Sequence, residues 1–94
     1  MSPRRPGSIR VLIPSPLRSY TGDRAEVPAA GTTLAAVFAD LEARHPGIRF
    51  RMIDEQDRIR PHLIVYLNGE PCRRLDRRVR PSDEIQIVAA LSGG

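Results

Sequence analysis

The chain has 94 residues and a net charge of +4, with 40% hydrophobic and 28% charged residues, which is typical of one small folded domain. The single cysteine, Cys72, excludes an internal disulfide, and no apolar stretch approaches the roughly 20 residues that a membrane span needs. Residues 1–7 are expected to form a flexible lead, and they lack the apolar stretch of a signal peptide, so we expect a cytoplasmic protein.

The first predicted element is a strand in "SIRVLIP". Ile9, Val11 and Ile13 recur at every second position, which is the period of a half-buried strand, and the two following prolines end it. The sequence "TGD" at residues 21–23 predicts a hairpin turn, because glycine and aspartate tolerate the backbone angles of tight turns. A short second strand is expected near residues 24–27.

The segment "TTLAAVFADLEARHPG" predicts the main helix. Its apolar side chains follow the i, i+3, i+4, i+7 spacing of one helix face; they are Leu34, Val37, Phe38 and Leu41. Thr32 or Thr33 can cap its start, and Pro46 with Gly47 closes it. A short helical turn near residues 49–53 and a polar loop are expected to follow.

The last third of the chain predicts three strands. "HLIVYL" alternates Leu63, Val65 and Leu67 with outward-facing residues, and Asn68-Gly69 is a strong hairpin signal leading to a short strand over residues 70–72. "DEIQIVAA" then alternates Ile85, Ile87 and Ala89 in a final strand. Two hairpins flanking a helix predict an α+β fold, in which the first and last strands can lie side by side and parallel in the middle of one sheet.

All basic side chains are arginine, and five of them crowd into "RRLDRRVR", residues 73–80. Aromatic residues make up only 4% of the chain and none lies in this stretch, which argues against a surface for single-stranded nucleic acid. A solvated turn is the first interpretation. The second is a docking site for an acidic protein partner, for which the candidates are Arg73, Arg74, Arg77 and Arg78.

The sequence contains no recognisable catalytic or metal-binding constellation. His45, His62 and Cys72 lack metal-ligand spacing, and no serine lies in a nucleophile-elbow context. We read His45 as a residue at a helix C-terminus, His62 as a residue at a strand edge, and Cys72 as a small buried or half-buried side chain. We therefore expect a protein that is not an enzyme and holds neither a metal nor a cofactor.

The sequence ends on "LSGG", residues Leu91 to Gly94. This ending could be a frayed terminus, but it also has a chemical use. A carboxylate on Gly94 can attack the α-phosphate of ATP and become an acyl-adenylate, which then accepts a sulfur or nitrogen nucleophile. Because glycine has no Cβ, such a tail can pass through a narrow channel, and four extended residues reach about 13–14 Å.

The order of elements, "IPSPLRSYTG", "LEARHPGI", "VYLNGE" and the final "GG" together resemble the MoaD/ThiS family of ubiquitin-like sulfur carriers. The resemblance runs from about Ser8 to Gly94. It implies a β-grasp fold, with a mixed sheet of four to five strands crossed by one main helix. The domain would span residues 8–90, followed by a flexible diglycine tail over residues 91–94.

The resemblance also implies the partners. A MoeB/ThiF-like activating enzyme would consume ATP to adenylate Gly94, and sulfur would convert it to a thiocarboxylate. In a branch that serves cysteine biosynthesis, a PLP-dependent synthase working on O-phosphoserine would accept the sulfur, and a zinc metalloprotease would release cysteine. Gly93, Ser92 and Leu91 would thread the tail into these enzymes. Ser92 departs from the alanine that these carriers often have.

Other interpretations stay open at this point. The chain could be the small subunit of a molybdopterin synthase, which would need an exposed apolar patch such as Ile64, Tyr66, Val88 and Leu91. It could be a binding module that uses its arginines, in which case loss of the last two glycines would have no effect. It could also modify other proteins covalently through Gly94. We expect neither nucleic acid nor membrane as a partner.

Overall fold

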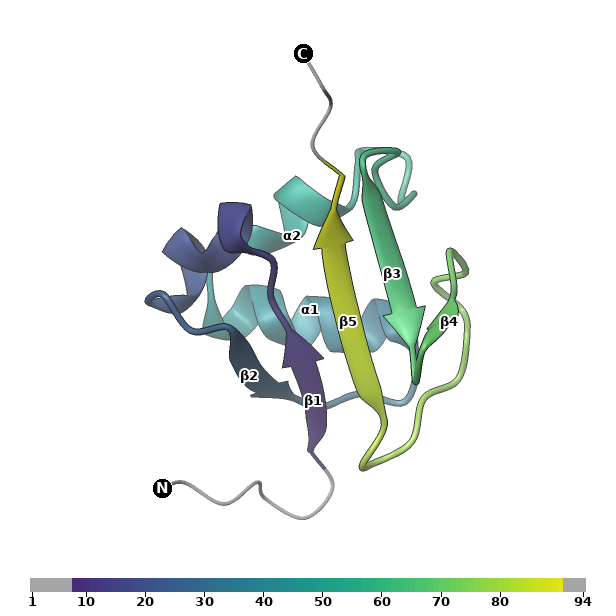
Figure 1. Cartoon of the computed structure of the whole chain (residues 1–94). Coiled ribbons are helices and arrows are strands. Elements are labelled where there is room, and N and C mark those ends of the chain that lie inside the picture. Colours follow the sequence, from purple (N-terminus) through teal and green to yellow (C-terminus); the bar gives the residue numbers. More distant parts are fainter. Residues whose placement is uncertain (1–7, 91–94) are drawn as a thin grey trace.

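The computed structural model of the protein describes residues 8–90, which form a five-stranded sheet crossed on one face by a helix (Figure 1). The predicted lead, residues 1–7, and the predicted tail, residues 91–94, lie outside the described residues. None of the helices in residues 8–90 has the length and hydrophobicity of a transmembrane span. In chain order the elements are β1 (Ile9–Leu12), the 3-10 helix η1 (Ser15–Thr21), β2 (Glu26–Ala29), α1 (Leu34–Arg44), α2 (Ile48–Met52), β3 (Leu63–Leu67), β4 (Glu70–Pro71) and β5 (Glu84–Ala89).

The sheet order is β2-β1-β5-β3-β4, and β5 lies in its centre (Figure 1). β1 and β5 are parallel, with Val11 opposite Ile85, whereas all other neighbouring strands are antiparallel. The prediction that the first and last strands lie side by side and parallel is therefore confirmed. The last strand is held between two neighbours before the chain reaches its C-terminal residues.

The core lies between the sheet and α1. The predicted helix face is fully buried, and the alternating residues of β1, β3 and β5 meet it from the sheet. The largest fully buried side chains include Phe38, Ile9, Leu34, Leu41, Ile48, Met52, Leu63, Ile85 and Ile87. Both helices cover the same face, so the opposite face of the sheet is open (Figure 1).

The start of α1 is capped by two different segments. Thr33 is the N-cap, and its Oγ1 accepts a hydrogen bond from the Ala36 N–H at 3.1 Å. The N–H groups of Leu34 and Ala35 donate to the carbonyls of Arg77 and Leu75, at 3.0 and 2.9 Å. The arginine-rich turn therefore satisfies the free amides of the helix with its backbone.

The connection between β1 and β2 differs from the predicted hairpin. The two strands are antiparallel, but residues 13–25 between them contain η1 instead of a tight turn. Gly22 and Asp23 do reverse the chain, with φ values of 62° and 65°, but they follow a helical segment that begins at Ser15 and has Pro16 in its first turn. The second strand is also shifted, to Glu26–Ala29, from the predicted residues 24–27.

The remaining elements agree closely with the sequence. α2 and β3 fall where they were predicted, and Asn68 and Gly69 form the expected turn with φ values of 50° and 87°. The strand after this turn is shorter than predicted: it covers Glu70 and Pro71 but not Cys72. The final strand alternates between the core and the open face as its sequence indicates.

Glu42 joins the two helices. Its carboxylate accepts the backbone N–H groups of Gly47 and Arg49, at 2.9 and 3.0 Å, and these bonds lower its pKa from the ordinary value of 4.5. A lowered pKa means that the ionised group stabilises the fold above about pH 4.5 and that this contribution is lost as the pH falls further. Glu42→Ala should therefore lower the Tm at pH 7, and this difference should shrink towards pH 3.

Thermal unfolding at both pH values tests this prediction. Glu55→Ala is the matched control, because the Glu55 carboxylate makes no hydrogen bond or ion pair within residues 8–90 and its removal should have little effect. An equal loss of Tm for Glu42→Ala at both pH values would show that the charge of this carboxylate does not matter.

Candidate functional site

The end of β5 is the point from which the predicted tail starts. The N–H of Ala90 donates to the carbonyl of His62 at 2.7 Å, so the chain is still fixed to the entry of β3 at its last described residue. The predicted site residues Leu91, Ser92, Gly93 and Gly94 lie outside the described residues. What the structure gives is the surface around their starting point, which Figure 1 places at the end of the sheet where η1 and α2 also lie.

A mostly apolar groove runs beside this exit. The ladder between β1 and β5 ends at Leu12 and Gln86, whereas β5 continues to Ala89. The prolines after β1 turn the chain away into η1, which leaves a recess of about 430 Å³ next to the end of β5. It is lined by residues of β1, of η1 and its approach, and of β5, among them Pro14, Pro16, Arg18 and Val88.

This groove is not predicted by the sequence. Its only local signal is "PSP", residues 14–16, which predicts the end of a strand. The prolines do end β1, but a recess arises only because the neighbouring strand is longer. The lengths of the two paired strands must therefore be compared before the groove can be recognised.

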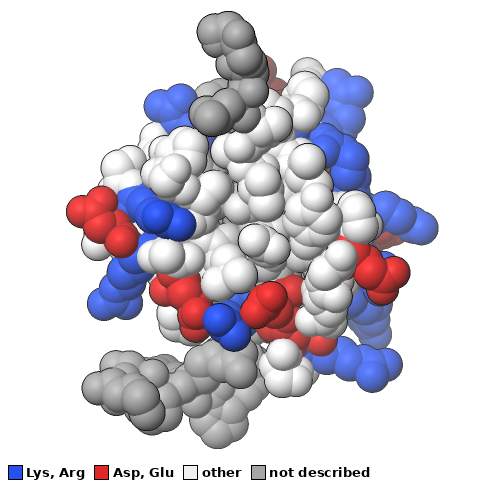
Figure 2. All heavy atoms as spheres, viewed as in Figure 1, with Lys and Arg blue, Asp and Glu red and all other residues white. Residues whose placement is uncertain are grey.

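The open face of the sheet brings together the three predicted apolar docking residues. Ile64 is directly opposite Val88 on the neighbouring strand, and Tyr66 is opposite Gln86. Ile64 is 37% exposed and is one of two exposed large hydrophobic residues within residues 8–90. Figure 2 shows that the middle of this face carries no charged side chain and that charged groups lie around it. Arg10 on β1 forms ion pairs at 2.8 and 3.2 Å with Glu26 and Glu84.

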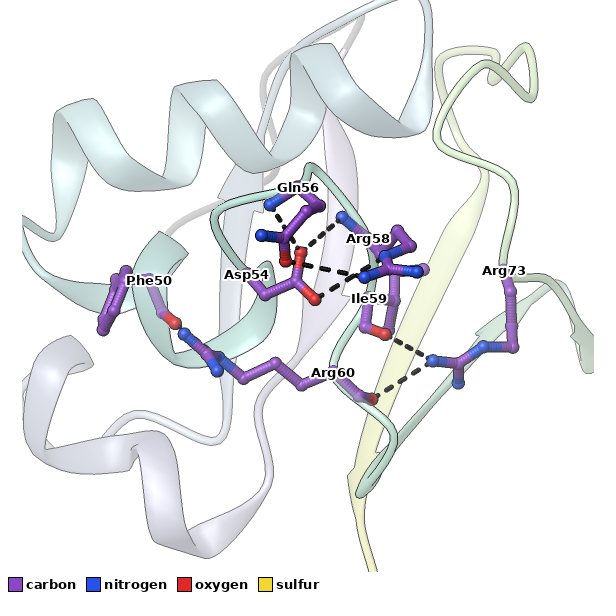
Figure 3. Close-up of polar contacts among 7 residues, drawn as sticks. All are labelled: Phe50, Asp54, Gln56, Arg58, Ile59, Arg60 and Arg73. Carbon is purple, nitrogen blue, oxygen red and sulfur yellow. Dashed lines mark hydrogen bonds and ion pairs between the residues drawn. The ribbon is translucent and has the colours of Figure 1, made fainter.

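Arg73 is engaged inside the domain. Its guanidinium donates to the carbonyl of Leu63 at 2.8 Å and to the carbonyls of Ile59 and Arg60 (Figure 3). These bonds connect the segment after β4 to the chain that enters β3. Of the four arginines predicted as docking residues, Arg73 is therefore used for hydrogen bonds within the domain.

The other three arginines lie on the surface of the turn. Arg74 forms a bidentate ion pair with Asp76, in which Nε donates to Oδ1 at 3.1 Å and Nη2 donates to Oδ2 at 3.0 Å. These hydrogen bonds lower the pKa of the Asp76 carboxyl. Arg77 and Arg78 are exposed, and their side chains make no ion pair within residues 8–90. This turn lies on the β4 side of the sheet, away from the end of β5 (Figure 1).

The candidates for conventional chemistry remain apart. His45 is the C-cap of α1, His62 precedes β3, and Cys72 is buried, with its thiol 3.7 Å from the carbonyl of Arg74. Within residues 8–90, no three His, Cys, Asp or Glu side chains are placed to hold a metal ion.

The fold and the position of the last strand define a ubiquitin-like β-grasp protein, with a mixed sheet, one crossing helix and a central strand that leads to the C-terminus. The ThiS family model matches residues 11–94, so the chain belongs to the ThiS family. The family resemblance seen in the sequence is thereby confirmed.

The curated relatives include the sulfur carrier protein CysO of Mycobacterium bovis. It is 37% identical over 92 residues, which cover 93% of this chain and 99% of that protein. CysO of Mycobacterium tuberculosis shows the same identity over the same shares.

Solved structures show the same likeness in three dimensions. A chain of the Amycolatopsis orientalis BexX/CysO complex matches with a TM-score of 0.84 and 34% identity, over 92% of this chain and 99% of that one. Mycobacterium tuberculosis CysO matches with a TM-score of 0.83 and 34% identity, over 88% and 99%. SAMP1 of Haloferax volcanii, at 23% identity and a TM-score of 0.80 over 94% and 100%, shares the fold.

Proposed function

We propose that this protein is a sulfur carrier whose Gly94 carboxylate is activated and converted to a thiocarboxylate. One observation carries the proposal: the ThiS family match extends through residue 94, so it includes the terminal Gly-Gly. The geometry supports it, because a central strand that is fixed up to Ala90 gives the last four residues a defined starting point. Four residues reach about 13–14 Å when extended, which is enough to enter an enzyme while the domain stays outside.

The proposed chemistry needs no catalytic group on this chain. A Gly94 carboxylate oxygen attacks the α-phosphate of ATP on an activating enzyme of the MoeB/ThiF type, and pyrophosphate leaves. Sulfide sulfur then attacks the adenylated carbonyl carbon, and AMP leaves, so that one carboxylate oxygen is replaced by sulfur. The protein contributes a carbonyl without a neighbouring Cβ and the binding surface that presents it.

We further propose that the sulfur is delivered to cysteine biosynthesis, because the relatives at 37% identity are named CysO. The thiocarboxylate sulfur would add to the aminoacrylate that a PLP-dependent synthase forms from O-phosphoserine. Acyl transfer from sulfur to nitrogen would leave cysteine in amide linkage to Gly94. A zinc metalloprotease would then hydrolyse that amide and release cysteine.

Intact-mass spectrometry tests the proposal. The protein is incubated with the activating enzyme of its host, ATP and sulfide, and the expected result is a mass gain equal to the exchange of one oxygen for sulfur. Subsequent addition of the synthase and O-phosphoserine should give a product heavier than the unmodified protein by one cysteine residue, and heavier than the thiocarboxylate by one aminoacrylate. The sulfur-carrier function would be rejected if the first mass shift is absent although the same enzyme preparation activates another carrier protein. Absence of the second shift alone would favour a different acceptor, such as the pterin of molybdopterin synthesis.

The uncharged centre of the open sheet face predicts where a processing enzyme binds. Ile64→Glu places a charge in the middle of the apolar group with Val88 and should weaken binding to the activating enzyme by about tenfold or more, because a buried unpaired charge is unfavourable. Its Tm should change little, since the side chain is already 37% exposed. Isothermal titration calorimetry measures the affinity.

Arg78→Glu is the control for this variant, because it changes a charge on the distant arginine-rich turn. We expect its affinity to stay within about twofold of the original protein, as is common for residues outside an interface. A larger loss of affinity for Arg78→Glu than for Ile64→Glu would identify the arginine-rich turn as the docking surface.

A further inference from the structure

A second recess lies beside the exit of β5, on the side of the two short helices. It encloses about 540 Å³ and is lined by residues of η1, of α2 and of the loop before β3. Its walls include Tyr20, Phe50, Arg51, Arg60 and His62. His62 also accepts the hydrogen bond from Ala90, and Pro16 lines both this recess and the groove described above. The two recesses therefore share Pro16 as a wall, and His62 connects this one to the end of β5.

Two arginine–aromatic pairs form the walls of this recess. The Arg60 guanidinium lies 4.6 Å from the centre of the Phe50 ring, and its Nε donates to the Phe50 carbonyl at 2.7 Å (Figure 3). The Arg51 guanidinium lies 5.9 Å from the ring of Tyr20, and its Nε donates to the Tyr20 hydroxyl at 2.7 Å. Both cations are thus held in fixed orientations before any partner arrives.

The nearby carboxylates are used elsewhere. Asp54 accepts the N–H groups of Gln56 and Arg58 and closes the loop between α2 and β3 (Figure 3), and Asp57 pairs with Arg49 at 3.2 Å. Glu55 is the one carboxylate that lines the recess, and it forms no ion pair within residues 8–90. Neither Arg51 nor Arg60 forms an ion pair with a carboxylate in that part of the chain, although the charge of Arg60 contributes, after the backbone N–H of Arg58, to lowering the pKa of Asp54. With two arginines and one carboxylate in its lining, the recess keeps an excess of positive charge.

Phe50 gives the recess an apolar component. It is 57% exposed, although it lies on a helix whose other apolar residues, Ile48 and Met52, are fully buried. An exposed phenylalanine with a cation stacked on it offers a surface to an apolar side chain and a charge to its anionic neighbours.

We propose that this recess binds an acidic segment of the enzyme that processes the tail, in which Asp or Glu residues flank one aromatic or aliphatic side chain. The carboxylates would pair with Arg51 and Arg60, and the apolar side chain would lie against Phe50. This inference rests on the proposed function, because a partner must bind next to Ala90 to receive the tail. The arrangement adds a second contact, on the helix side, to the one expected on the open face of the sheet.

The first test uses a peptide and does not depend on any enzyme. The full-length protein, labelled with 15N, is titrated with acetyl-Asp-Glu-Phe-Glu-Asp-amide, and the neutral acetyl-Asn-Gln-Phe-Gln-Asn-amide is the control. We expect amide shifts that cluster at Tyr20, Phe50, Arg51, Arg60 and His62, only with the acidic peptide, and that weaken at high salt. Shifts centred on residues 73–80, or equal shifts with both peptides, would overturn the proposal.

The second test uses the activating enzyme and ATP–pyrophosphate exchange. The variant with Arg51→Glu and Arg60→Glu should raise the KM for the carrier about tenfold or more and leave kcat nearly unchanged, because charge reversal weakens association and not the chemistry. Arg77→Glu with Arg78→Glu is the matched control and should change the KM less than about twofold. Phe50→Ser tests the apolar contact without a change of charge, and Tm values check that each variant is folded.

The outcomes separate the two proposals. If the original protein supports exchange and the double variant keeps its KM, the recess is not a docking site, although the carrier function stands. If the original protein supports no exchange with an enzyme that is active on another carrier, the sulfur-carrier function falls, and this docking inference falls with it.

Discussion

Deletion of Gly93 and Gly94 is expected to abolish thiocarboxylate formation, with a loss of more than about 100-fold in rate. The shortened chain still ends in a carboxylate, now on Ser92, so it keeps the reacting group. That group lies about 7 Å closer to the folded domain, because each extended residue spans roughly 3.3–3.6 Å. It would stop short of an active site that the full tail reaches, and intact-mass spectrometry after incubation with the activating enzyme, ATP and sulfide measures the loss.

Three further tail variants separate length from residue type. Addition of one alanine after Gly94 should abolish the reaction, because the terminal carboxylate is displaced and no longer belongs to glycine. Gly94→Ala keeps the length but adds a methyl group to the Cα next to the reacting carbonyl, and this variant should react more slowly than the original protein. Ser92→Ala should be nearly unaffected, since both side chains are small. Retention of full activity by the deletion variant would show that Gly94 is not the sulfur-carrying residue.

Gly31→Ala is expected to destabilise the domain by about 3 kcal/mol, from the combined effects of backbone strain and overpacking. Gly31 precedes α1 and has a φ of 157°, and a Cβ built there would lie 2.7 Å from the Val37 nitrogen and 2.9 Å from atoms of Ala36. Two of the three nearest atoms belong to the helix backbone, which cannot move without shifting Val37 and the core around it. Urea unfolding monitored by circular dichroism measures the change.

Gly22→Ala is the matched control for this variant. Gly22 also has a positive φ, 62°, but a Cβ there would meet nothing within 4 Å. We expect a loss of only about 1–2 kcal/mol, which is the ordinary penalty of a left-handed conformation for alanine. If the two variants are equally destabilised, the close approach of residue 31 to α1 does not limit stability.

Local signals in the sequence were sufficient for the regular elements. The spacing of Leu34, Val37, Phe38 and Leu41 predicts the buried face of α1, and Asn68-Gly69 predicts the turn after β3. These features depend on neighbours within a few residues, because helix and strand periods and turn angles are properties of a short stretch of chain. The predicted tail and its chemistry also come from the sequence, through four residues and a family resemblance.

The sequence could also have indicated one exposed residue that we did not identify. Ile48 and Met52 are four residues apart and share the buried face of α2, which leaves Phe50 on the opposite side. An aromatic residue at that position signals an exposed apolar site. Its pairing with Arg60, ten residues later, could not be predicted, because it depends on the path of the loop closed by Asp54.

Sequence by itself determined the α+β class, the two faces of each main element and the diglycine ending. Only the tertiary structure decided which surfaces surround that ending. Arg73 and Arg78 look alike in "RRLDRRVR", yet the first donates to three backbone carbonyls and the second faces solvent. The reason is physical: periodicity and turn preference act between near neighbours, whereas strand pairing, the groove beside β5 and the partners of each guanidinium depend on segments that only folding brings together.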